Sequence, residues 1–200
     1  ITVDRYLRLR FEDLAALIRA LKLERPILMG HSMGSASVAQ FAARYPDVPR
    51  AVILEDPALV RPATPATGAT PPTVEQRQAT ILARNNMSEQ ELVAGCMKNS
   101  PKWGQSECEF WAPSKRRHHP GTAAIGTGAR PPMTELFVKI TAPTLVLKAD
   151  AQGDLRKQNE DVAAKLPKGK IVHIEGAGHN VRRENKMQTL EVLRAFLSTT

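Results

Sequence analysis

A five-residue segment, Gly-His-Ser-Met-Gly at residues 30–34, constrains the fold more than any other part of the chain. It follows an apolar run at 26–30 without polar alternation, as in a strand buried on both faces of a parallel sheet. The alanine-rich residues 33–44 come next and are predicted to form a helix. We expect side chains at either glycine position to collide with the strand and the helix. The segment therefore predicts a strand–turn–helix unit with Ser32 on a strained turn.

Apolar patterning along the rest of the chain predicts an α/β fold. Residues 11–23 carry apolar side chains at helical spacing, and the predicted helix stops before Pro26. Three further apolar runs are expected to be buried strands: 51–54, 143–147 and 170–174. Helices are expected at 154–166 and at the C-terminus. The C-terminal helix has an apolar face made by Met187, Leu190, Leu193 and Phe196. This alternation predicts a parallel sheet with helices on both faces.

The middle of the chain interrupts this alternation. From residue 59 to 132 it is rich in proline, glycine, threonine and alanine, and 62–72 have the composition of a linker. We therefore expect an α/β core made of residues 1–58 and 138–200. A mainly helical and irregular insertion, residues 59–137, is expected between the two parts of that core.

Helix signals nevertheless occur inside the insertion. Helices are expected within 73–98, with starts at Thr73 and at Ser88. Ser88 and Glu91 have the residue types of a capping box, in which each side chain bonds the backbone N–H of the other residue. Residues 118–132 have a loop-like composition.

Length and composition exclude several classes of protein. The 200 residues suit one soluble globular domain, and the net charge is +8. The densest basic run lies at 115–119, but no nucleic-acid-binding motif accompanies it, so no nucleic-acid partner is expected. No apolar run approaches the roughly 20 residues of a membrane helix. The N-terminus also lacks the basic and apolar regions of a signal peptide.

The two cysteines, Cys96 and Cys108, are too few for a disulfide framework. We therefore expect them to be reduced, which favours a cytoplasmic location. Their spacing relative to His118 and His119 matches no common zinc motif. No metal or other cofactor is expected.

A serine at the end of a buried strand is well placed for chemistry. The predicted turn lifts the Ser32 hydroxyl above the carboxyl edge of the sheet, at a helix N-terminus that favours negative charge. A serine hydroxyl is a weak nucleophile and needs an adjacent base. His179 follows the last strand at that same edge, so we expect it to be the base. His173 lies within a strand and is expected to be packed, whereas His31 is expected to shape a pocket.

The two glycine-containing segments together carry a family resemblance. Gly-His-Ser-Met-Gly at 30–34, with Gly-Ala-Gly-His-Asn at 176–180, resembles the α/β-hydrolase superfamily and its nucleophile elbow. The resemblance implies a catalytic triad in the chain order serine, acid, histidine, with Ser32 and His179 as two members. It also implies that the Met33 N–H contributes to an oxyanion hole and that the insertion caps the active site.

Aromatic residues of the insertion extend this resemblance. The segment Trp103-x3-Glu107-x3-Trp111 resembles a cap segment of some members of the superfamily. The resemblance implies a substrate pocket, acyl or aromatic, lined by Trp103, Phe110 and Trp111 as well as by His31. The alternative is that the aromatic residues form a small core of the cap itself.

The acid of the triad is the least determined member. At the common family position after strand 143–147, the expected aspartate falls on Gln152, which cannot serve. Other members carry the acid after the strand that follows the serine helix, and Asp56 occupies that place here. We therefore favour Asp56. The alternatives left open are Asp154, Asp150 and Glu55.

The superfamily's usual sheet has more strands than this sequence predicts. The resemblance covers the C-terminal two-thirds of the usual domain, and the strands that normally precede residues 11–23 are not found. Strand 26–30 is then expected at an exposed sheet edge, which a missing segment or a partner chain would cover. Because the missing part supplies the second oxyanion N–H, good activity is expected to need it.

The favoured function is therefore cleavage of a small-molecule carboxylic ester or lactone through an acyl-enzyme on Ser32. The same fold also carries out C–C bond hydrolysis, perhydrolysis and acyl transfer, which the turn does not distinguish. A truncated, non-catalytic binding protein is the remaining alternative.

Overall fold

The computed structural model describes residues 3–60, 70–124 and 131–200. These residues divide into two compact units. One unit contains residues 70–124, and the other contains residues 4–60 and 131–200. Most of the expected linker lies outside the described residues.

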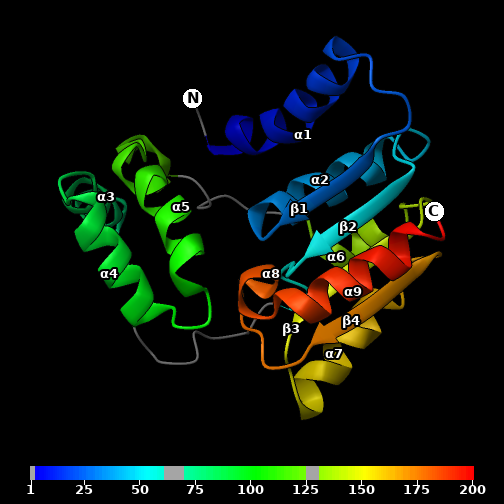
Figure 1. The fold of residues 1–200 in the computed structure, drawn as a ribbon. Helices are drawn as coiled ribbons and strands as arrows, with labels where there is room; N and C mark the ends of the chain where they lie inside the picture. The colour runs from blue at the N-terminus through cyan, green and yellow to red at the C-terminus, as the bar shows by residue number, and fades with distance from the viewer. Residues whose placement is uncertain (1–2, 61–69, 125–130) are drawn as a thin grey trace. The chain divides into compact units, whose positions relative to one another are not determined.

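The second unit is built on a four-stranded parallel sheet. Its strands are β1 (Ile27–His31), β2 (Ala51–Glu55), β3 (Thr144–Ala149) and β4 (Gly169–Ile174). They pair in the order β1-β2-β3-β4, and every pair is parallel (Figure 1). All four strands were expected from apolar runs, so the predicted fold class is confirmed. In the described part of the chain, β1 and β4 are the edges of this sheet.

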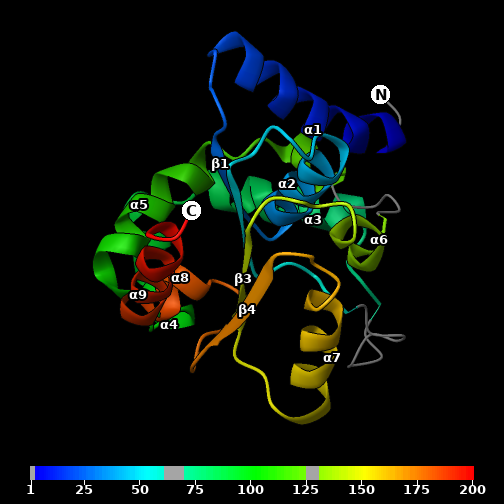
Figure 2. The same cartoon turned by 90° about the vertical axis from the view of Figure 1, so that its right-hand side faces the viewer.

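Helices cover both faces of the sheet, as predicted. One face packs against α1 (Val3–Ala20), α2 (Met33–Arg44), α6 (Met133–Phe137) and α7 (Gly153–Ala163). The other packs against α8 (Val181–Glu184) and α9 (Lys186–Leu197). Figure 2 shows α9 on one side of the strands and α7 on the other. Alternation along β2 explains this arrangement, because Val52 and Leu54 join one core cluster and Ile53 joins the other.

Two helical predictions need correction. The first helix ends at Ala20 rather than near residue 23, because the chain turns there and Lys22 and Arg25 adopt positive φ angles of 50° and 44°. In α9, Met187 is 80% exposed and is not part of a buried face. Further along that helix, Leu193 and Phe196 do pack against the sheet.

The unit at 70–124 is helical. It contains α3 (Val74–Asn85), α4 (Glu89–Asn99), α5 (Gly104–Arg116) and a 3-10 helix (Pro120–Ala124). The predicted helix starts are confirmed, since Thr73 and Ser88 both form complete capping boxes. In the second box the Ser88 N–H donates to Glu91 over 2.8 Å, and the Glu91 N–H donates to the Ser88 hydroxyl over 3.2 Å.

The expectation of two free cysteines is wrong. Cys96 of α4 and Cys108 of α5 form a disulfide bond, with their Cα atoms 5.7 Å apart. The chain turns back between α4 and α5 and brings the two cysteines together. A count of cysteines does not reveal this pairing. A disulfide persists in oxidising compartments, so the cytoplasmic expectation loses its basis. Among the described residues, the helices lack the length or apolar character needed to cross a membrane.

Candidate active site

Ser32 lies on a strained turn between β1 and α2. Its φ and ψ angles are 53° and −113°, a conformation that residues with a side chain rarely adopt. A Cβ atom at Gly30 would lie 2.3 Å from the backbone oxygen of Gly34, so position 30 admits glycine alone. The prediction for Gly34 is wrong, since a Cβ atom there would meet no described residue within 4 Å outside the backbone of its own helix. The first glycine therefore makes the turn possible, and the second does not.

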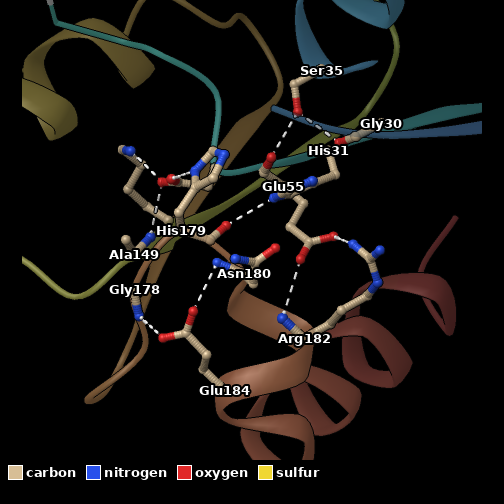
Figure 3. Close-up of polar contacts among 12 residues, drawn as sticks. Gly30, His31, Ser35, Glu55, Ala149, Gly178, His179, Asn180, Arg182 and Glu184 are labelled. Carbon is tan, nitrogen blue, oxygen red and sulfur yellow. Dashed lines mark hydrogen bonds and ion pairs between the residues drawn. The ribbon is translucent and has the colours of Figure 1, made fainter. Parts of the chain in front are cut away.

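The turn is fastened to the neighbouring strand. The Ser32 N–H donates to the Glu55 carbonyl oxygen over 2.9 Å. The Ser35 hydroxyl lies 2.6 Å from the Gly30 carbonyl oxygen and 2.9 Å from that of Glu55, as Figure 3 shows. Ser35 is fully buried and was missed from the sequence, where it is one small residue in an alanine-rich helix. These bonds hold the carboxyl ends of β1 and β2 together.

His179 and Asp56 lie in direct contact at this sheet edge. The His179 Nδ1 is 2.6 Å from the Asp56 Oδ2, although the two residues are 123 positions apart in the chain. Asp56 directly follows β2, has a φ angle of 42°, and donates its N–H to the Leu147 carbonyl oxygen over 2.7 Å. Of the four acids considered from the sequence, the favoured one is thus beside the predicted base.

Two further donors contact the other oxygen of Asp56. The Lys148 ammonium forms an ion pair with Oδ1, and the Ala149 N–H donates to the same oxygen over 3.2 Å. Burial favours the neutral acid, but the bonds from Lys148 and His179 outweigh it and hold the pKa of Asp56 below its usual value. An ionised carboxylate only accepts hydrogen bonds, so His179 Nδ1 carries a proton. In the neutral imidazole, Nε2 then has a lone pair that can accept a proton.

The alternative acids lie elsewhere, and two of them, Glu55 and Asp150, have other partners. Glu55 is fully buried, accepts the Arg182 N–H over 3.1 Å, and forms an ion pair with the Arg182 guanidinium (Figure 3). Asp150 accepts the Gly176 N–H over 2.9 Å. Asp154 lies in the first turn of α7. Within the described residues, none of the three is bonded to His179.

Polar contacts fix the loop that carries His179. Glu184 accepts the Gly178 N–H over 2.6 Å and the Asn180 N–H over 3.1 Å (Figure 3). The His31 ring lies 4.7 Å from the His179 ring, and its Nε2 is 2.8 Å from the His179 carbonyl oxygen. Because a carbonyl oxygen only accepts, His31 Nε2 carries a proton. These contacts were not foreseen from the sequence, where they join residues on different elements.

The Ser32 hydroxyl and the His179 ring are not hydrogen-bonded to each other in the part of the chain that the structure describes. Both belong to the carboxyl edge of the sheet, and 54% of the His179 side chain is exposed there. Catalytic contacts often tighten only when substrate binds. Met33 is the first residue of α2, so its N–H belongs to the helix N-terminus beside Ser32.

The two tryptophans lie within the helical unit. Their rings are 6.5 Å apart at an interplanar angle of 76°. They line a cavity of about 270 Å³ together with residues of α3 and α4, among them Arg84, Glu91 and Leu92. Phe110 is 84% exposed and is not among the lining residues. The disulfide bond contributes to the cavity wall through Cys96.

The basic run at 115–119 is partly used inside the same unit. Lys115 lies over the Trp111 ring at 5.3 Å, and Arg116 pairs with Glu89 at 3.8 Å. The amide of Asn85 donates to the Arg116 and His118 carbonyl oxygens, each over 3.0 Å. These contacts give the run a structural role at the end of α5.

Known proteins resemble this chain over most of its length. The bifunctional esterase/perhydrolase DCH of Acinetobacter calcoaceticus is 23% identical over 201 residues, which span 93% of this chain and 72% of that protein. A thermophilic esterase from Thermogutta terrifontis (malate bound) is 26% identical, with a TM-score of 0.64 over 94% of this chain and 71% of that one. E-2-(acetamidomethylene)succinate hydrolase has a TM-score of 0.65 at 20% identity, over 94% and 72% of the two chains.

The family itself follows from a match over most of the chain. The model of the alpha/beta hydrolase family matches residues 3–188, and the parallel sheet with helices on both faces agrees with that match. The resemblance found in the 30–34 and 176–180 segments thus extends to the fold. The chain belongs to the alpha/beta hydrolase family.

Proposed function

We propose that this protein is a serine hydrolase that cleaves a carboxylic ester or lactone through an acyl-enzyme on Ser32. The observation that carries the proposal is the 2.6 Å contact between His179 and Asp56 at the sheet edge that also bears the strained Ser32 turn. A histidine oriented by an ionised carboxylate is the base that a serine nucleophile requires. The alpha/beta hydrolase fold is consistent with the serine, acid, histidine order in the chain.

In the proposed first half-reaction, Ser32 Oγ attacks the carbonyl carbon of the ester and His179 Nε2 takes the hydroxyl proton. The carbonyl oxygen becomes an oxyanion, which the Met33 N–H stabilises at the α2 N-terminus. When the tetrahedral intermediate collapses, the carbon–oxygen bond to the leaving group breaks, and His179 gives its proton to the departing alcohol. Asp56 stays ionised throughout and stabilises the charged histidine.

In the second half-reaction, water attacks the acyl-enzyme while His179 takes one of its protons. The bond between the acyl carbon and Ser32 Oγ then breaks, the proton returns to Ser32, and the carboxylic acid leaves. Perhydrolysis is the second candidate, because one relative is a bifunctional esterase/perhydrolase. In that reaction hydrogen peroxide replaces water and the product is a peracid. C–C bond hydrolysis and acyl transfer use the same nucleophile and are outcomes of the substrate tests below.

We assign substrate contact to His31, next to His179. Trp103 and Trp111 line the cavity of the helical unit, and we propose that they contact substrate in that cavity. Within the insertion expected at 59–137, the helical unit at 70–124 is proposed to act as the cap, whereas residues 133–137 form α6 and pack on the sheet. No nucleic acid is needed for this function, and the expected partner is a small-molecule ester. The open edge of β1 in the described sheet is proposed to pair with a further strand, from a longer chain or from a partner.

Labelling with a fluorophosphonate probe tests the nucleophile. Wild type is expected to be labelled once, Ser32→Ala not at all, and Ser37→Ala on the same helix like wild type. Absence of labelling in wild type, or labelling that persists in Ser32→Ala, contradicts the proposal.

A panel of esters and lactones of increasing acyl length then defines the substrate class. Parallel reactions with hydrogen peroxide test for peracid. Hydrolysis of esters without peracid production supports the first candidate over the second. Failure of every ester and lactone, with labelling retained, excludes the proposed substrate class and points to C–C hydrolysis or acyl transfer.

A further inference from the structure

Lys148 contacts the proposed triad acid, yet the proposed mechanism gives it no task. Its ammonium group forms an ion pair with Asp56 Oδ1, and the side chains of the two residues are 14% and 9% exposed. A lysine held this far from solvent loses hydration and conformational freedom, which its bond to the carboxylate must offset. The ammonium group of Lys148 lies against the carboxylate that contacts His179, and its role there needs an explanation.

The hydrogen bonds divide the two oxygens of Asp56 between separate partners. Oδ1 faces Lys148 and the Ala149 N–H, whereas Oδ2 faces His179 Nδ1. A carboxylate with one oxygen fixed in this way has one orientation in which the other oxygen reaches the histidine. Lys148 comes from β3 and His179 from the loop after β4, so the two partners approach from different elements.

We propose that Lys148 is a positioning residue for the proposed hydrolysis: its ammonium group fixes one oxygen of Asp56 so that the other stays ionised and directed at His179. The inference rests on the proposed function in that Asp56 is taken as the triad acid. Among the described residues, no hydrogen bond joins Lys148 to His179, since each contacts a different oxygen of Asp56. The effect of Lys148 on the reaction is therefore carried by Asp56.

The charged and titratable groups around this pair come from several elements. His173 of β4 lies opposite Lys148 in the strand register, and Asp150 follows β3 and bonds Gly176. The remaining neighbours are His179 on Asp56 and His31 on His179. Glu55, the residue before Asp56, is paired with Arg182. Among the described residues, Lys148 is the one lysine or arginine side chain bonded to Asp56.

The surroundings of Lys148 suit a neutral, unbranched replacement of similar size. Lys148 lines a cavity of about 100 Å³ that is mainly apolar, with two polar residues, and its other lining residues include Ala58, Leu59, Val60, Ala151, Leu155, Asp150 and Asn159. In Lys148→Met, a flexible apolar side chain is expected to fit this lining. The substitution then removes the charge and the N–H donors with little loss of packing.

Removal of Lys148 leaves burial as a large remaining influence on Asp56. Burial raises the pKa of Asp56, so the carboxyl should take up a proton at higher pH in Lys148→Met than in wild type. A protonated or rotated carboxyl no longer orients His179. We expect kcat to fall about tenfold with KM unchanged, and the acid limb of the kcat/KM profile to move to higher pH.

The experiment combines kinetics with a direct titration of the Asp56 carboxyl carbon by NMR, with its signal identified by Asp56→Asn. Lys148→Met is compared with Lys148→Arg, which restores the cation, and with Lys157→Met, which breaks a surface lysine–aspartate pair on α7. We expect the Asp56 titration to move to higher pH in Lys148→Met. Lys148→Arg should recover most of the wild-type behaviour, and Lys157→Met all of it.

An unchanged Asp56 titration and an unchanged acid limb in Lys148→Met overturn the inference. If Lys148→Met does not fold, Lys148→Gln, which keeps N–H donors without a charge, is judged by the same two results. If wild type shows neither fluorophosphonate labelling nor hydrolysis, the proposed function fails. In that case the carboxyl titration alone decides whether Lys148 controls Asp56.

Discussion

Two adjacent carboxylates, Glu55 and Asp56, lie at the end of β2, and they differ in the side chains that pair with them. Glu55 is fully buried and pairs with Arg182, whose guanidinium is always charged. Asp56 is paired with a lysine and with a histidine whose side chain is half exposed. The cation beside Glu55 is an arginine, whereas one of the two partners of Asp56 is a histidine, a side chain that can gain and lose a proton near neutral pH. Of the two adjacent acids, we therefore propose a structural role for Glu55 and a role in the reaction for Asp56.

The largest expected effect is a loss of activity that distinguishes Asp56 from Glu55. Asp56→Asn should lower kcat by about 10⁴-fold, because an amide supports the wrong tautomer of the histidine and does not stabilise its charged form. Steady-state kinetics on the best ester of the panel measures this loss. Glu55→Gln is the matched control, and its kcat should stay within about tenfold of wild type. Equal losses in the two variants would remove the distinction.

The second prediction separates the two residues by stability. Arg182→Met leaves the buried Glu55 carboxyl without its cation, and we expect the free energy of unfolding to fall by about 3 kcal/mol. Glu55→Gln should cost about 1 kcal/mol, because the Arg182 side chain is 44% exposed and can turn to water. Urea unfolding of both single variants and of the double mutant gives the interaction free energy between Glu55 and Arg182. A larger loss in Glu55→Gln than in Arg182→Met would reverse the interpretation.

The third prediction concerns acid stability and applies to Asp56. Because its folded-state pKa lies below the ordinary value of 3.8, the unfolded chain binds more protons over the interval between the two. The stability that Asp56 contributes is therefore fully present above pH 3.8 and is lost as pH falls through its folded-state pKa. Unfolding free energies measured down through that interval should fall more steeply in wild type than in Asp56→Asn. The same dependence of unfolding free energy on pH in wild type and Asp56→Asn would contradict a lowered pKa of Asp56 in the folded protein.

The smallest expected effect tests whether the histidine loop depends on Asp56 alone. Glu184 accepts two backbone N–H groups of that loop, and glutamine retains one of its two acceptor oxygens. Glu184→Gln should cost about 1 kcal/mol in unfolding free energy and lower kcat less than tenfold. Urea unfolding measures the first value and steady-state kinetics on the best ester measures the second. A loss of kcat as large as that of Asp56→Asn would show that the loop, rather than the carboxylate, holds His179.

Much of this site could be predicted because its signals are local. The 30–34 turn, the strand before it and the helix after it are all contained in 18 consecutive residues. Asp56 could be favoured because parallel strands bring their carboxyl ends to one edge, where His179 was also expected. The helix starts at Thr73 and Ser88, and the capping box at Ser88, were readable for the same reason, since the capping partners are three residues away.

The parts that escaped prediction depend on pairs distant in the chain. Lys148 and Asp56 are separated by 92 residues, and Arg182 and Glu55 by 127, so their contact depends on strand register and side-chain rotamer together. The Cys96–Cys108 bond depends on how two helices turn back on each other. Gly34 was misjudged for a different reason. Its position in the pentapeptide suggests crowding, but the described residues that surround this turn of α2 leave the space for a Cβ atom open.

The asymmetry between the two glycines has a consequence for recognising such turns in other sequences. Alanine fits at position 34, where it should also favour the helix by about 0.5–1 kcal/mol, but not at position 30, where a backbone oxygen occupies the space. A search pattern that demands both glycines would therefore discard chains with the same geometry. A pattern that fixes the first glycine and allows any small residue at the fifth place would retain them.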